Sequence, residues 1–334
     1  MRTLLNTLFV TQPEAKFSLS NRNIVIIIRG QEVQRYPLVN LESIVSFSYH
    51  SFTPSLIGEC LENGINVSFI SPYGKFLGRL VGETKGNVLL RREHYRKADN
   101  PEFSLNLAKT FVKAKVTNCI RVLKRFNYSQ SNTLIKNVID KLFSYMKEID
   151  FADDKATLRG VEGFLAKEYF SGFKHMMLCD DFVFTCRSKH PPKDYINSLL
   201  SLGYTLLLNE ITSALESVGL DSYVGFYHVD ISGRKSLSFD LMEELRAVFV
   251  DKFILNLINL KQITLNDFGQ DFKLTKEGLR KFLTLWHEKN QKEIFNSVYD
   301  GRIKIGLIPY AQAMFLARYL REESSEYLSF KGVV

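Results

Sequence analysis

Cysteine, proline and long apolar runs are all scarce in this sequence. Its 334 residues include 4 cysteines and 8 prolines. Cysteines that are so few and irregularly spaced are typical of a protein kept reduced in the cytoplasm, so we expect no disulfides. The most apolar stretches, at 24–28 and 253–260, are far shorter than the roughly 20 residues that cross a bilayer. The sequence therefore predicts no membrane segment.

One group of histidines and cysteines has the atom types that bind zinc. A His-x3-Cys-x6-Cys-x3-His pattern includes His175, Cys179, Cys186 and His190. The interval between its two cysteines is wider than the spacing usual in zinc sites. The apolar residues at 182–184, inside that interval, are typical of buried packing. We therefore favour packing, with structural zinc as the alternative.

Positive charge is concentrated in one part of the chain. The sequence has 44 basic and 36 acidic residues, a net charge of +8, and its 45% apolar content is ordinary for a folded protein. Residues 85–125 contain eleven basic and three acidic residues, so this segment alone accounts for the excess. Such concentration is typical of a protein that binds a polyanion, either nucleic acid or an anionic membrane. A solvated helix face is the alternative.

This basic segment has helical periodicity with two distinct faces. A spacing of four and three residues predicts a core-facing side made of Val112, Val116, Cys119, Leu123 and Phe126. A separate stripe contains Lys109, Lys113, Thr117, Arg121 and Lys124. A phosphate backbone can follow such a stripe. We expect DNA contacts from Arg91, Arg92, Lys109, Lys113, Arg121 and Lys124.

Strand-like and helical patterns divide the chain near residue 90. Before that point, short β-branched or alternating runs predict strands at 23–29, 31–37, 43–48, 67–70 and 75–81, a turn at 71–74, and a first strand within 1–10. One helix is expected at Pro54–Glu62, ended by Asn63 and Gly64. After Glu93 the periodicity is helical nearly to the end. We predict an α+β protein, with a small β-strand-rich domain at 1–90 and a larger all-α-helical domain at 91–334.

Two acids and a histidine in the second half suit a divalent metal. Asp240 and Glu243 are three residues apart in an amphipathic stretch, which places both carboxylates on one helix face near its start. His228 lies twelve residues before Asp240, across a turn at 232–234. Mg²⁺ prefers oxygen ligands and Mn²⁺ also accepts imidazole, so this set suits phosphodiester chemistry. Two structural alternatives stay open, namely a helix capping box for the acids and an ordinary loop or core role for the histidine.

Glu162 is flanked by glycines inside a helical pattern at 157–170. Each of the two, Gly160 and Gly163, costs the helix about 1 kcal/mol relative to alanine. Glycines at such positions usually mean that another backbone or a ligand comes close. Glu162 is therefore either a third member of the metal set, brought in by the fold, or an ordinary exposed helix carboxylate.

Several segments, taken in their order and spacing, resemble one known family. They are LNTLFVT at 5–11, GNVLLRR at 86–92, PPKDYIN at 191–197 with LLSLGY at 199–204, His228 with SLSFDLMEE at 236–244, and Pro309 and Tyr310 with QA at 312–313 and LAR at 316–318. Over essentially its whole length the chain resembles the CRISPR-associated endonucleases and integrases, the first-numbered Cas proteins. These proteins capture foreign DNA fragments and insert them into a CRISPR array. The first half is most similar to members from type I systems.

The resemblance implies a first domain that mediates homodimerisation and a helical second domain that carries the catalytic site. It implies metal ligands at Glu162, His228 and Glu243, Asp240 as an additional catalytic acid, and Mg²⁺ or Mn²⁺ as the cofactor. The implied reaction is a transesterification, in which the 3′-hydroxyl of captured DNA attacks a phosphodiester of the CRISPR repeat. With water as the nucleophile, the same site would cut DNA. The implied partners are double-stranded DNA and the second-numbered Cas protein.

Two other functions are compatible with the charge distribution. A non-catalytic nucleic-acid-binding assembly protein needs only the basic segment, and the charge pattern by itself does not separate it from a nuclease. A peripheral membrane protein would use the same basic stripe against anionic lipid. The family resemblance favours the integrase.

Overall fold

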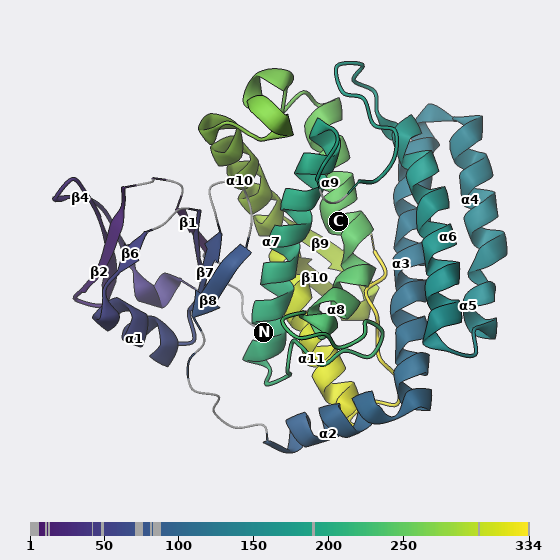
Figure 1. Ribbon diagram of the computed structural model, residues 1–334, viewed down its shortest axis with the longest axis horizontal. Coiled ribbons are helices and arrows are strands. Elements are labelled where there is room, and N and C mark those ends of the chain that lie inside the picture. The colour runs from purple at the N-terminus through teal and green to yellow at the C-terminus, as the bar shows by residue number, and fades with distance from the viewer. Residues whose placement is uncertain are drawn as a thin grey trace. The chain divides into compact units, whose positions relative to one another are not determined.

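The computed structural model describes residues 7–10, 12, 14–41, 43–47, 50–70, 76–80, 82, 88–188, 191–299 and 301–332 (Figure 1). Contacts divide the chain into two compact units. The first consists of Met1–Gly86, Leu274–Glu293 and Lys304–Leu307. The second consists of Asn87–Lys273, Ile294–Ile303 and Ile308–Val334.

Strands build two four-stranded sheets in the first unit. One sheet has the order β1-β5-β7-β8, with β1, β5 and β7 parallel and β8 antiparallel to β7. The other has the order β4-β3-β2-β6, in which β3 is antiparallel to both of its neighbours and β6 is parallel to β2. The strands are β1 (Thr7–Val10), β2 (Lys16–Ser20), β3 (Asn23–Ile28), β4 (Gln31–Pro37), β5 (Ser43–Ser46), β6 (Ser51–Phe52), β7 (Asn66–Ile70) and β8 (Phe76–Leu80). The strands predicted from the sequence are confirmed within a few residues, and the turn predicted at 71–74 lies outside the described residues.

The core of the first unit joins both sheets to helix α1 (Pro54–Glu62). Pro54 occupies the first helical position, where its missing N–H costs no hydrogen bond, and Gly64 follows the end with a φ of 68°. The predicted helix is confirmed. Apolar side chains from strands and helix pack together, namely Phe17, Ile24, Ile26, Ile44, Leu56, Cys60 and Val67. Removal of this apolar surface from water stabilises the unit.

The chain after residue 87 is mostly helical, which confirms the predicted fold class. Its helices are α2 (Val88–Asp99), α3 (Pro101–Gln130), α4 (Thr133–Met146), α5 (Glu148–Phe151), α6 (Lys155–Phe173), α7 (Tyr195–Ser217), α8 (Ser236–Arg246), α9 (Lys252–Asn259), α10 (Lys276–Gln291, in the first unit) and α11 (Ile308–Leu320). Two short strands, β9 (Glu293–Asn296) and β10 (Gly301–Lys304), pair with each other. The prediction that this part of the chain contains only helices is wrong in this detail. Four-residue strands are too short to give a clear periodic signal.

Helix α3 is the central support of the second unit. Its start is capped by Asn100, whose side chain accepts a hydrogen bond from the Phe103 N–H at 3.0 Å. The helix packs against α4, α6 and α8, and Figure 1 shows α3, α4 and α6 side by side. Val112, Val116, Cys119 and Leu123 are buried, as predicted, and Phe126 is half-buried.

Helices α2 and α3 hold the loop that precedes α8. Nε2–H of His94 donates to the Val224 carbonyl at 2.9 Å, and the Ser104 hydroxyl donates to the Phe226 carbonyl at 2.8 Å. The His94 ring also stacks on Phe226, with centroids 5.5 Å apart. Burial lowers the pKa of His94, and its Nδ1 is a buried atom for which the described residues provide no hydrogen-bond partner.

The free energy of unfolding should therefore fall as the pH decreases below about 6.5, the ordinary histidine pKa. The folded-state pKa of His94 is lowered, so the unfolded chain takes up a proton first. The contribution of neutral His94 to the free energy of unfolding is complete above the unfolded-state pKa. It is lost as the pH falls towards the folded-state pKa. Urea unfolding at a series of pH values measures this loss. In His94→Gln, which keeps a donor for Val224, the profile should be flatter, and identical profiles would contradict the assignment.

Candidate active site

Helix α8 carries three acids that are buried from solvent. Asp240, Glu243 and Glu244 are 0%, 3% and 0% exposed. The helix begins at Ser236, and the residue at its N-cap, Lys235, makes no side-chain cap. The capping-box alternative for Asp240 and Glu243 is therefore wrong. Buried charges are costly unless donors or cations compensate them, so the surroundings of each acid define the site.

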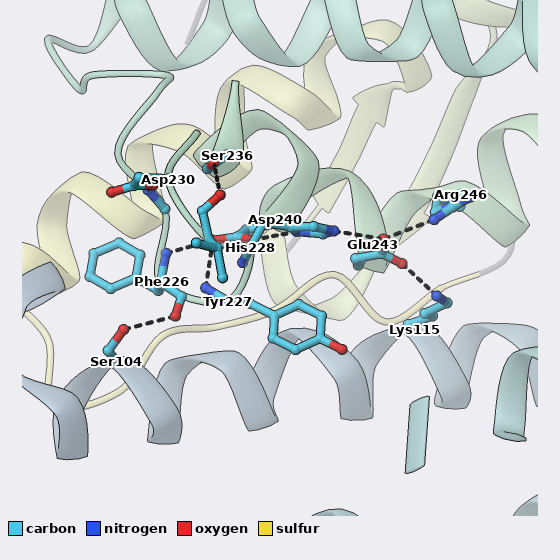
Figure 2. A network of polar contacts seen from close by, with 12 residues as sticks. Ser104, Lys115, Phe226, Tyr227, His228, Asp230, Ser236, Asp240, Glu243 and Arg246 are labelled. Atoms are coloured by element: carbon cyan, nitrogen blue, oxygen red, sulfur yellow. Dashed lines mark hydrogen bonds and ion pairs between the residues drawn. The ribbon is translucent and has the colours of Figure 1, made fainter. Parts of the chain in front are cut away.

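Asp240 fixes the loop that carries His228. Its Oδ2 accepts hydrogen bonds from the N–H groups of Phe226 at 2.6 Å and Tyr227 at 2.9 Å (Figure 2). Its Oδ1 accepts from the N–H of His228 at 2.8 Å and from the ring Nδ1 of His228 at 2.7 Å. A carboxylate can only accept, so in the neutral imidazole Nδ1 carries the hydrogen and donates it in a hydrogen bond to Asp240, which leaves a lone pair on Nε2. Asp240 thus uses both oxygens to position the loop and the imidazole.

The approach of this loop to α8 depends on Gly225. A Cβ at position 225 would lie 2.7 Å from Cβ of Ser236 and 2.9 Å from Oδ2 of Asp240. Both distances are below normal van der Waals separation, so a side chain here would push the loop away from the carboxylate. The sequence analysis did not single out this glycine.

Glu243 and Glu162 converge on a lysine that sequence reasoning missed. Nζ of Lys115, on α3, forms an ion pair with Oε2 of Glu243 at 2.6 Å and contacts Oε1 of Glu162, on α6. The Lys115 side chain is only 11% exposed, because its spacing from Val112 and Cys119 places it on the core-facing side of α3. A lysine at an apolar helix position was the available signal, because a buried lysine needs anionic partners.

Arg246 supplies a second cation, one helical turn after Glu243. Its Nη1 donates to Oε1 of Glu243 at 2.8 Å. Burial on its own would raise the pKa of Glu243, but the cations of Arg246 and Lys115 outweigh it and lower that pKa below its ordinary value. Glu243 is therefore anionic throughout the neutral pH range.

His228 borders the same cluster. Its Nε2 lies 4.0 Å from Oε1 of Glu243, and its side chain is 19% exposed. The side chain of Glu162 is 21% exposed, so the cluster reaches the surface at these two residues. The structure thus brings Glu162, His228 and Glu243 into one cluster, with Lys115 between the two acids.

The donor set suits a hard divalent cation, although a lysine holds its centre. Within the described part of the chain, no group of three or more acids, histidines or cysteines has a metal-binding arrangement. The ammonium of Lys115 stands where the two carboxylates converge, which marks this point as one that attracts a cation. Oε2 of Glu243 is buried and, apart from its ion pair with Lys115, has no hydrogen bond from a described residue. Carboxylates and an imidazole with a free Nε2 fit Mg²⁺ or Mn²⁺.

The two glycines beside Glu162 leave the surface of α6 bare. A Cβ at position 160 or 163 would have nothing within 4 Å, and both residues are exposed. No described backbone therefore comes close to either glycine, so the expectation of a close backbone approach is wrong. What remains is open space over α6 at the two glycines themselves.

The basic stripe of α3 contacts other helices more than expected. Nζ of Lys109 donates to the Asp150 carbonyl at 3.0 Å, Lys113 forms an ion pair with the Asp150 carboxylate, and Nζ of Lys124 lies 4.5 Å from the ring centroid of Phe143. These partners belong to α4 and α5, which pack along α3. Arg91 is half-buried, and neither the exposed Arg92 nor the half-buried Arg121 has an ion pair with another described residue. The stripe is therefore not a continuous free surface.

The zinc alternative finds no geometric support among the described residues. The Cys179 thiol donates to the Asp181 carboxylate at 3.5 Å, and Cys186 is exposed. His190 lies outside the described residues.

The fold is shared with solved structures. A casposase bound to its integration product has a TM-score of 0.82 at 22% identity, covering 96% of this chain and 92% of that chain. A Cas6-RT-Cas1–Cas2 complex has a TM-score of 0.83 at 23% identity, covering 100% of this chain and 37% of that chain.

Sequence comparison then identifies the family. The family model described as CRISPR associated protein Cas1 matches residues 8–288. The CRISPR-associated endonuclease Cas1 1 of Chlorobaculum tepidum is 39% identical over 342 residues, which cover 99% of each chain. The chain therefore belongs to the CRISPR-associated Cas1 family, as its motifs predicted. In the part of the chain that the structure describes, no helix is both long and apolar enough to span a membrane.

Lys115→Met should destabilise the fold strongly. Methionine fills the same space but leaves Glu162 and Glu243 without their shared cation, and breaking a buried ion pair costs about 3–5 kcal/mol. Guanidinium unfolding followed by circular dichroism measures the loss in metal-free buffer.

Lys113→Met is the matched control, since it alters the same helix and removes an ion pair whose partners are 41% and 57% exposed. That exposed pair should contribute about 0–1 kcal/mol. Equal losses in the two variants would contradict a special role for Lys115.

Proposed function

We propose that this chain is a metal-dependent DNA endonuclease and integrase of CRISPR adaptation, which inserts captured DNA into a CRISPR array by transesterification. The observation that carries the proposal is the convergence of Glu162, His228 and Glu243 from three separate segments. Relatives named as endonucleases match the chain over nearly its full length. A casposase bound to its integration product, with the same fold, also supports the assignment.

In this proposal the carboxylates of Glu162 and Glu243 and Nε2 of His228 would hold Mg²⁺ or Mn²⁺. When bound, the metal would supply Lewis-acid activation of a hydroxyl nucleophile and neutralise charge on the phosphate. Asp240 keeps the hydrogen of His228 on Nδ1, so that the lone pair of Nε2, on the side of Glu243, would be available to the metal. Arg246 keeps Glu243 ionised and fixes its orientation.

The attacking group is the 3′-hydroxyl of a captured DNA end, and water in its place gives DNA cleavage. The bare surface of α6 at Gly160 and Gly163 leaves room for DNA to approach this helix. Arg91, Arg92 and Arg121 are the basic residues best placed to meet DNA, because Lys109, Lys113 and Lys124 already have protein contacts. Their contacts to phosphate provide affinity rather than sequence selection.

The proposed partners follow from family membership. We assign homodimerisation to the β-rich first domain, within residues 1–90, and catalysis to residues 91–334. Double-stranded DNA is the substrate, and the second-numbered Cas protein, Cas2, joins the integrase. A Cas6-RT-Cas1–Cas2 complex with the same fold supports the last point. The proposed place of action is the cytoplasm.

Glu162→Gln should abolish catalysis with little effect on folding. Glutamine keeps the shape but removes a charge needed for the metal, so strand transfer and DNA cutting in Mn²⁺ should fall by about 100-fold or more. Glu162 is preferred to Glu243 for this test, because Glu243 is buried between two cations and its loss would also unfold the protein. Gel assays of strand transfer, with DNA binding measured in parallel, give the result.

Glu168→Gln is the matched control on the same helix. Glu168 also pairs with a lysine, Lys141, at 2.8 Å, but lies outside the cluster. The activity of Glu168→Gln should be unchanged.

One observation favours the alternative of a non-catalytic assembly protein, namely that Lys115 already satisfies both acids. Full function in Glu162→Gln would support that alternative and overturn the enzyme.

The salt dependence of DNA binding should depend on the unpaired arginines. Arg92→Gln and Arg121→Gln should each reduce the slope of log affinity against log salt by about one, as expected for the loss of one phosphate contact. Lys109→Gln and Lys113→Gln should have smaller effects, since both ammonium groups are bound to Asp150. Fluorescence anisotropy over a salt series measures the slopes. Larger effects from the two lysines would reverse the assignment.

A further inference from the structure

Tyr227 lies inside the cluster, and its hydroxyl is not used by the fold. The residue is 2% exposed and lies between Phe226 and His228, in the loop that Asp240 holds. Figure 2 shows the phenol ring extending from this loop above α3, on the side where Lys115 and Glu243 meet. Among the residues that the structure describes, none forms a hydrogen bond with the Tyr227 hydroxyl.

A buried hydroxyl without a partner is costly for the fold. An unsatisfied buried donor loses its hydrogen bonds to water and gains nothing in return. Such groups are rare in folded proteins, and each one calls for a specific role. Phenylalanine would fill the same volume without the cost, so packing alone does not explain a tyrosine at this position.

The surroundings of this hydroxyl are anionic. The carboxylates of Glu162 and Glu243 lie close enough to act on the phenol, which is protonated at neutral pH and is therefore a hydrogen-bond donor. Oε2 of Glu243 belongs to the same cluster and is bound by the Lys115 ammonium at 2.6 Å. The Tyr227 donor thus lacks a hydrogen bond while Lys115 is the shared cation of the acids.

We propose that Tyr227 is a positioning residue for the metal site, whose hydroxyl donates to a carboxylate of Glu162 or Glu243 when a divalent metal replaces the Lys115 ammonium as their shared cation. This inference rests on the proposed metal-dependent function. A carboxylate that binds a metal through one oxygen keeps lone pairs for a second donor, and such supporting hydrogen bonds orient metal ligands. The unfavourable burial of the hydroxyl in the metal-free protein is thereby offset in the loaded state.

The test is Mn²⁺ binding to Tyr227→Phe in the full chain. Titration of Mn²⁺ followed by electron paramagnetic resonance gives the affinity, and thermal melting with and without Mn²⁺ gives the stability. The variant should bind Mn²⁺ about 10- to 100-fold more weakly than the natural chain, the usual effect of losing a supporting hydrogen bond. Its metal-free melting temperature should be equal or higher, because the unsatisfied hydroxyl is gone.

Tyr327→Phe is the matched control. The Tyr327 hydroxyl is buried and donates to Oε1 of Glu244 at 2.6 Å, so its removal should lower the metal-free melting temperature and leave the Mn²⁺-induced increase unchanged. Tyr227→Phe that behaves like this control would overturn the inference and leave the proposed function intact. Absence of Mn²⁺ binding in the natural chain would overturn both.

Discussion

The requirement to compensate three buried carboxylates on α8 holds the second unit together. Asp240 takes its donors from the 226–228 loop, Glu243 takes cations from α3 and from the end of α8, and Glu244 accepts hydrogen bonds from Gln312, Tyr327 and the Phe330 N–H. Each acid therefore draws a different part of the chain to one helix. An uncompensated charge at Asp240 or Glu243 would cost more than a lost packing contact, because transfer of an ion from water is so unfavourable. At Glu244, burial raises the pKa to about 7, and neutral hydrogen-bond donors satisfy the side chain. The geometry of the candidate site follows from charge compensation.

Polar and aromatic contacts also connect the cluster to the surrounding core. The guanidinium of Arg246, which binds Glu243, also lies 4.6 Å from the ring centroid of Tyr204 on α7. The Tyr204 hydroxyl donates to Asp251, in the widened π turn at Ala247–Asp251 that follows α8. Turns of this type are frequent at functional sites because they displace one side chain from the regular helical register. The carboxylate of Glu243 is thus fixed through a chain of polar and aromatic contacts that ends in rigid helices.

Local patterns predicted the local features of this protein, and tertiary contacts explain the rest. The ends of α1 could be predicted because proline and glycine mark them, and Asp240 and Glu243 share a face because of their spacing. Glu162 could be joined to them only through the family resemblance, since no local rule links residues so far apart. Lys109 and Lys113 were expected to be free, but Asp150 reaches them from a separate helix, which sequence spacing cannot show. Lys115 was counted among the basic residues and not recognised as a core residue.

The bonds of Glu244 impose an order on how the protein is made. Its partners Tyr327 and Phe330 are 83 and 86 residues further along the chain. During translation α8 leaves the ribosome well before them, so its acid stays solvated or unpaired until the later segment has been synthesised. Glu243, the neighbouring residue, has its cations on α3 and at the end of α8, both synthesised before residue 327. Closure of the C-terminal segment over α8 is therefore the step that completes the hydrogen bonds of Glu244, and a nascent chain that stops before residue 327 lacks them.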